Sequence, residues 1–151
     1  MDLRVLAVGR LRPAFREACD DYRRRLSRFA RVEEREFREG QGEGAARAER
    51  EAAGMLEAVP PNARLVALTR DGRPWASREL ADQVRRWAVE SRPVAFAIGG
   101  SEGLGEPVLT RSAERWSLGP LTLPHELARV IVYEQLYRAF TILEGHPYHR
   151  G

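Results

Sequence analysis

Short apolar runs alternate along the chain with longer stretches in which apolar residues recur every three or four positions. The runs at residues 3–8, 64–68 and 94–98 suit strands that are buried on both faces of a sheet. The three- and four-residue spacing predicts helices at residues 13–29, 45–58, 77–91, 106–113 and 124–144. Strands that alternate with helices indicate an α/β fold, with a mainly parallel sheet flanked by helices.

Three other segments are less regular. Residues 31–37 are mostly charged, so we predict an exposed edge strand there. Residues 69–72 (TRDG) suit a turn after the second buried strand, and Ser77 suits the N-cap of the helix that follows. Gly119 and Pro120 interrupt an apolar stretch, so residues 118–123 are expected to be extended or looped, with free backbone amides and carbonyls.

The run VAFAIGGSEGLG, residues 94–105, is the feature around which the other elements are arranged. Its strand ends in two glycines, where a small ligand can approach the main chain. A plain strand-to-helix turn explains the same residues equally well. In a parallel sheet, the strand ends at Gly9, Leu68 and Gly99 would share one edge and form a cleft. The chain has neither a G-x-G-x-x-G motif nor a lysine for a P-loop, which disfavours dinucleotide and P-loop chemistry.

Apolar residues of the last helix spread over more than one face, as Leu127, Ile131, Leu136 and Phe140 illustrate. A surface helix needs only one apolar stripe. The helix is therefore either deeply buried or packed against a second subunit, and we favour the second subunit.

Composition narrows the class of protein. The 151 residues suit one domain, residues 1–151, and no apolar run is long enough to span a membrane. Without a signal-peptide pattern, we expect a cytoplasmic protein. The single cysteine, Cys19, excludes an internal disulfide and a cysteine-based zinc site, and we predict no metal. All 25 basic residues are arginine and the net charge is +3, which is compatible with a polyanionic partner but is weak support alone.

Three segments resemble the SPOUT-class ribosomal RNA large subunit methyltransferase H family: IGGSEGL, SLGPLTLPHELARVIVYEQLYRAF and the terminal HPYHRG. The similarity covers the whole chain from LRVLAVGRLR onward. It implies a SPOUT fold with a C-terminal trefoil knot and a homodimer. It also implies that S-adenosyl-L-methionine is used to methylate N3 of a pseudouridine in 23S rRNA, within assembled ribosomes. The positions that match the family's cofactor site are Leu68, Gly99, Leu118, Gly119, Pro120, Leu121, Thr122 and Leu123.

The terminal residues Tyr148, His149 and Arg150 are our candidates for the catalytic groups. A phenol, an imidazole and a guanidinium suit a nucleotide substrate, and we expect this tail over the mouth of the cofactor pocket. His125 and Glu134 are the alternatives for the proton acceptor. Two other functions stay open at this point: methylation of a different RNA nucleotide, and a non-enzymatic RNA- or ribosome-binding module.

Overall fold

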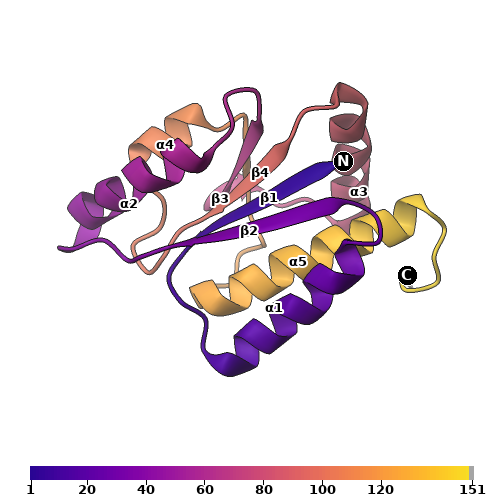
Figure 1. Cartoon of the computed structure of the whole chain (residues 1–151), viewed down its shortest axis with the longest axis horizontal. Coiled ribbons are helices and arrows are strands. Elements are labelled where there is room, and N and C mark those ends of the chain that lie inside the picture. The colour runs from indigo at the N-terminus through magenta and orange to yellow at the C-terminus, as the bar shows by residue number, and fades with distance from the viewer. Residues whose placement is uncertain (150–151) are drawn as a thin grey trace.

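The computed structural model describes residues 1–149, and within them five parallel strands form one sheet in the order β2-β1-β4-β3-β5. The strands are β1 (Asp2–Val8), β2 (Arg31–Phe37), β3 (Arg64–Arg73), β4 (Val94–Ile98) and β5 (Glu114–Trp116). The helices are α1 (Pro13–Leu26), α2 (Gly44–Ala58), α3 (Ser77–Glu90), α4 (Glu106–Arg111) and α5 (His125–Leu143). The predicted α/β fold with a parallel sheet is therefore confirmed (Figure 1).

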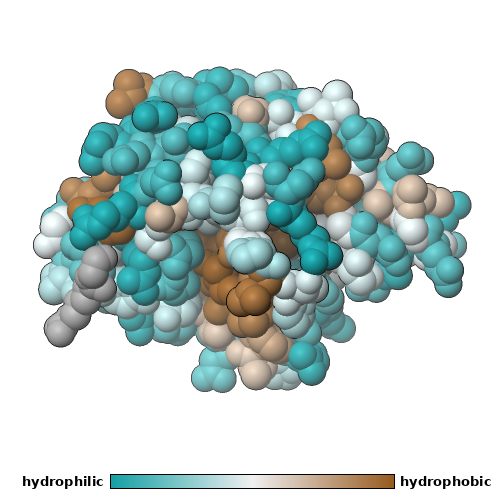
Figure 2. Space-filling view, turned by 180° about the vertical axis from the view of Figure 1, so that it is seen from behind, coloured by the Kyte–Doolittle hydropathy of each residue, from teal (hydrophilic) through white to brown (hydrophobic). Residues whose placement is uncertain are grey.

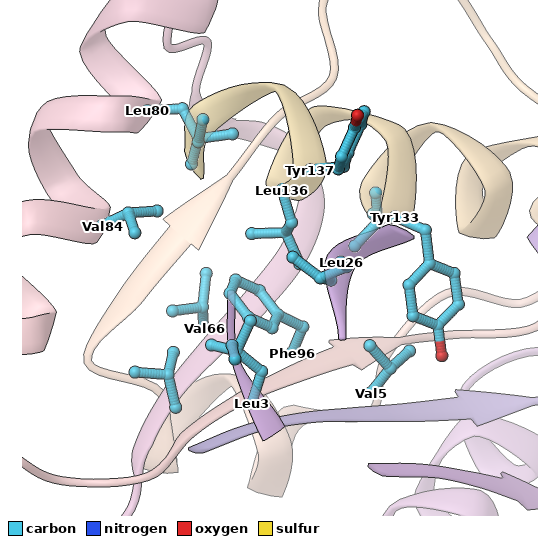
Figure 3. Close-up of a cluster of buried hydrophobic side chains, with 14 of the residues drawn as sticks. Leu3, Val5, Leu26, Val66, Leu80, Val84, Phe96, Tyr133, Leu136 and Tyr137 are labelled. Atoms are coloured by element: carbon cyan, nitrogen blue, oxygen red, sulfur yellow. The ribbon is translucent and has the colours of Figure 1, made fainter. Parts of the chain in front are cut away.

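Helices cover both faces of the sheet, with α2 and α4 on one side and α1, α3 and α5 on the other (Figure 1). Side chains alternate along each strand, so Leu3 and Val5 pack toward one layer while Leu6 and Val8 pack toward the other. Figure 3 shows the larger core, where Phe96 lies among leucine and valine side chains from strands and helices. Both faces are apolar because both are covered, which explains the unbroken apolar strands.

Three local predictions differ from the structure. Residues 69–72 are not a separate turn: β3 continues to Arg73, with a register irregularity between Leu68 and Arg73 against β5. Ser77 is not the cap of α3, because Ala76 holds that position while Ser77 Oγ donates a hydrogen bond to Gln135 on α5. The strand β5 was not predicted, since three residues give too little pattern to recognise.

Helix α5 lies between α1 and α3 on one face of the sheet, and its own chain buries most of it. Val132, Tyr133, Leu136 and Ala139 are fully enclosed. Burial within the chain thus accounts for Leu136 and Phe140, whereas Leu127 is exposed and Ile131 is half-buried. The homodimer and the trefoil knot stay predictions.

The charged strand β2 is an edge strand, as expected, and its acidic residues have specific partners. Arg16 of α1 donates hydrogen bonds to Glu34 and Glu36, each at 2.7 Å. Cys19 lies in the core, and burial raises the pKa of its thiol to about 11. The acidic pattern of β2 therefore arises from packing against arginines of the helices above it.

Candidate functional site

A hollow of about 430 Å³ opens at the carboxyl ends of β3 and β4 and beside the segment that follows β5. We call it the cofactor pocket. The residues that line it include Leu68, Gly99, Leu118, Gly119, Leu121, Thr122 and Leu123, together with His125 and Ala128 at the start of α5. Of the positions taken from the family resemblance, only Pro120 is absent from its wall. Residues from three distant parts of the sequence thus meet in one cavity of a size typical for small-molecule sites.

The glycines after β4 shape one wall by folding the chain back on itself. Gly100 and Gly103 form an isolated antiparallel bridge, and Gly103 has a φ of +75°. A Cβ atom placed on Gly99 would lie 2.5 Å from the carbonyl carbon of Gly103, which is closer than real atoms approach. Glycine is therefore required at position 99 by the loop's own backbone, in addition to any contact with a ligand.

The segment 117–123 forms the opposite wall and keeps its backbone available. Gly119 has a φ of +114°, and its amide donates to Ser117 Oγ at 3.1 Å. Within the described residues, the amides of positions 121–123 donate to no other group of the chain. Arg70 at the end of β3 reaches across and donates to Thr122 Oγ1 at 2.5 Å. Sequence reasoning missed Arg70, and its signal was its place two positions after Leu68.

Buried charges hold the start of α5 beside this pocket. Arg129 is 1% exposed; it donates to the Gly9 carbonyl at 2.9 Å and pairs with Glu36. Burial alone would raise the pKa of Glu36, but hydrogen bonds and positive charges from Arg129 and Arg16 hold that pKa below its usual value. Because Gly9 follows β1 and adjoins the His125 ring, Arg129 fixes α5 against the strand ends.

The described part of the tail packs on the other half of α5. The Tyr148 ring lies 4.6 Å from the Tyr137 ring, centroid to centroid, and its hydroxyl donates to Glu134 at 3.0 Å. Burial, with hydrogen bonding to Tyr22 and Glu134, raises the pKa of Tyr148. His149 Nδ1 is buried and has no hydrogen-bond partner within residues 1–149. Arg150 lies outside the described residues.

The tail therefore does not lie over the cofactor pocket of its own chain, and a position over the pocket of a second chain stays a prediction. His125 lines the pocket, whereas Tyr137 lies twelve positions further along α5, which corresponds to about 18 Å of helix. Figure 1 shows the segment that follows α5 at the end of that helix opposite its start. Glu134, the alternative proton acceptor, belongs with the tail, and His125 belongs with the pocket.

The described residues contain no group of three or more histidine, cysteine, aspartate or glutamate side chains placed to hold a metal ion. None of the helices in residues 1–149 combines the length and apolar character that crossing a membrane requires.

Known proteins that are similar to this chain are described as methyltransferases. Residues 1–149 match the family described as "Predicted SPOUT methyltransferase". Proteins named ribosomal RNA large subunit methyltransferase H, from Pseudomonas aeruginosa PAO1 and Pseudomonas putida W619, are 44% and 43% identical over 99% of this chain and 100% of their own length.

Solved structures share the fold at low sequence identity. A probable methyltransferase from Bordetella pertussis Tohama I has a TM-score of 0.57 and 16% identity, over 91% of this chain and 95% of that one. A probable methylase family protein from Haemophilus influenzae Rd KW20 has a TM-score of 0.54 and 12% identity, over 97% and 67%. The full-length family match and the close relatives carry the assignment: the chain belongs to the SPOUT methyltransferase family, in the group whose members are named ribosomal RNA large subunit methyltransferase H.

Proposed function

We propose that this protein uses S-adenosyl-L-methionine to methylate N3 of a pseudouridine in 23S rRNA, on assembled ribosomes in the cytoplasm, with residues 1–151 acting as one domain. The observation that carries the proposal is the meeting of Leu68, Gly99 and the segment 118–123 in one cavity. The relatives at 44% identity, which are named as methyltransferases of ribosomal RNA, support the substrate class.

The residues of the pocket fit such a cofactor. Apolar side chains at Leu68, Ile98 and Leu118 suit the faces of an adenine ring, and the free amides of positions 121–123 suit its polar edge. When bound, the cofactor supplies a methyl group already activated by a sulfonium. The chain then has to orient the acceptor nitrogen behind that methyl and keep water away.

Methylation at N3 requires that a proton leaves the nitrogen as the new N–C bond forms and the S–C bond breaks. The proton goes to a base on the protein or to solvent. We assign this acceptor to the tail, with His149 as the titratable group and Tyr148 as the group that contacts the base. Since these residues lie far from the pocket of their own chain, the proposal places them in the pocket of a second copy.

We also propose a homodimer that covers the exposed apolar surface near the start of α5. Leu121 is 77% exposed and Leu127 is 36% exposed. Figure 2 shows hydrophobic surface gathered in the lower middle of the back face, over this part of the molecule. Within one chain the cofactor pocket and the tail lie apart, so a second copy is needed to bring them together. Analytical ultracentrifugation at micromolar concentration is expected to show a dimer, and a monomer would contradict the proposal.

The function is tested with ribosomes from a strain that lacks the gene. The protein should bind S-adenosyl-L-methionine in calorimetry and transfer one labelled methyl group to 23S rRNA. Nucleoside analysis of the product should show N3-methylpseudouridine. A different methylated nucleoside would redirect the proposal to another RNA target. Absence of cofactor binding by the folded protein would favour a non-enzymatic RNA-binding role.

A further inference from the structure

A second hollow of about 610 Å³ adjoins the cofactor pocket, and arginine side chains line it. Three arginines reach it from three elements: Arg73 from the end of β3, Arg86 from α3 and Arg115 from β5. We call these three residues and the hollow the arginine groove. Asp71 and Arg115 line both this groove and the cofactor pocket, so one leads into the other.

The groove arginines differ from most others because no carboxylate neutralises them. Arg73, Arg86 and Arg115 are exposed, and none forms an ion pair with any residue in the described range 1–149. By contrast, Arg16 pairs with Glu34 and Glu36.

Two acidic residues, Glu114 and Asp71, also line the groove, but they offset only part of this charge. Glu114 is already bound by Arg64. Asp71 is the remaining carboxylate, so the hollow keeps a net positive charge.

The floor of the groove is rigid. The Trp75 ring lies 6.0 Å from that of Trp87 and 6.1 Å from that of Trp116, and the latter two side chains are buried in the core. Arginines that lie beside such a packed surface keep their spacing. Less conformational entropy is therefore lost when they bind a ligand. A guanidinium presents a planar fork of donors that matches phosphate oxygens.

We propose that the arginine groove binds backbone phosphates of the rRNA strand that flanks the target nucleotide. This inference rests on the proposed function and names the surface by which the substrate is held. A strand laid along the groove reaches the cofactor pocket at Arg115, where a base turned out of the strand meets the methyl donor. Phosphate contacts of this kind fix register and orientation, whereas the tail and the pocket select the base.

The test compares Arg73→Ala/Arg86→Ala with Arg24→Ala/Arg28→Ala, which we call the α1 variant and which removes the same charge from the exposed last turn of α1 and from the turn after it. Both residues of the test variant are exposed and unpaired, so folding should be kept. Binding to 70S ribosomes is measured by co-sedimentation at several salt concentrations between 50 and 200 mM. We expect the groove variant to bind roughly tenfold or more weakly, with a slope of log affinity against log salt shallower by about two. The α1 variant should bind like the wild type.

Two controls separate this inference from the proposed function. The groove variant should keep its affinity for S-adenosyl-L-methionine and its kcat at saturating ribosomes, so that the loss appears in KM. If the groove variant keeps the ribosome affinity and the salt slope of the wild type, the proposal that the groove binds rRNA phosphates is wrong. An equal loss in the α1 variant would also overturn it, because overall charge would then explain binding. If the proposed function fails instead, the wild type itself will bind no cofactor and methylate no ribosome, while co-sedimentation still tests the groove.

Discussion

The two ends of α5 are built from different interactions. At the first end, Arg129 is enclosed, pairs with two carboxylates of β2 and binds the carbonyl that follows β1. At the second end, Arg138 and Glu134 form a partly exposed pair, and Glu134 also accepts from the Tyr148 hydroxyl. The first end is fixed to the sheet and shapes a pocket. The second end holds a tail by contacts that solvent reaches, which suits a group that must change partners.

The tail should be needed for methyl transfer but not for cofactor binding. Deletion of residues 147–151 is expected to lower the methylation rate at least ~100-fold, the lower range for a general acid–base group. Because the tail lies at the second end of α5, the affinity for S-adenosyl-L-methionine should stay within about twofold of the wild type. Rate and affinity are measured by ribosome methylation and calorimetry. A rate near that of the wild type would return attention to His125.

The pocket should show the opposite behaviour. Gly99→Ala places a Cβ against the Gly103 backbone and forces the loop open, so cofactor affinity should fall at least tenfold while tail contacts persist. Calorimetry gives the affinity, and circular dichroism checks the fold. Gly145→Ala is the matched control: it adds the same atom at a positive φ of +68°, where nothing lies within 4 Å. Equal affinities in both folded variants would contradict this role of the loop.

The two arginines of α5 should differ in their effect on stability. Arg129→Met leaves the Gly9 carbonyl without its donor and reduces the cations beside Glu34 and Glu36 to Arg16, so it should lower the free energy of unfolding by about 3 kcal/mol. Arg138→Met removes a pair whose side chains are 29% and 16% exposed, so its cost should stay below about 1 kcal/mol. Urea unfolding of the two variants gives both values. Similar losses would remove the distinction between the two ends.

The smallest effect is a dependence of stability on pH at the first end. The pKa of Glu36 is lowered in the folded protein, so its charged form adds stability above the unfolded value near 4.5. That contribution is lost as the pH falls through the lower, folded pKa. The urea midpoint should therefore drop between pH 5 and the acid limit of folding, and less so in Glu36→Gln. If the urea midpoint changes with pH in the same way in the wild type and in Glu36→Gln, Glu36 contributes nothing to this pH dependence.

Much of the fold follows from local pattern. The buried strands β1 and β4, the edge position of β2 and all five helices agree with periodicity and turn residues, because burial on both faces leaves a clear signal. Other features depend on contacts between distant segments. The charges of Glu34 and Glu36 make sense only once Arg16 and Arg129 lie above them, and a sequence pattern does not reveal that pairing.

The site shows the same division. The pocket residues that the family resemblance indicated, apart from Pro120, do meet in one cavity, since strand ends of a parallel sheet share an edge. The position of the tail on its own chain could not be predicted, because a segment after a helix stop can fold back along either side. The contact between Tyr148 and Tyr137 fixes the position of the tail on its own chain, and that contact depends on the whole helical layer.

Complementation between two impaired variants, assayed at a cofactor concentration too low to saturate Gly99→Ala, tests most directly the central claim that pocket and tail act together across a dimer. Gly99→Ala supplies an intact tail and the deletion of residues 147–151 supplies an intact pocket. Mixed dimers, formed by co-expression with two different affinity tags, should recover a substantial fraction of wild-type methylation from one complete site. Homodimers of each variant are the controls. Mixed dimers that are verified by sedimentation and stay as impaired as both homodimers would contradict the account.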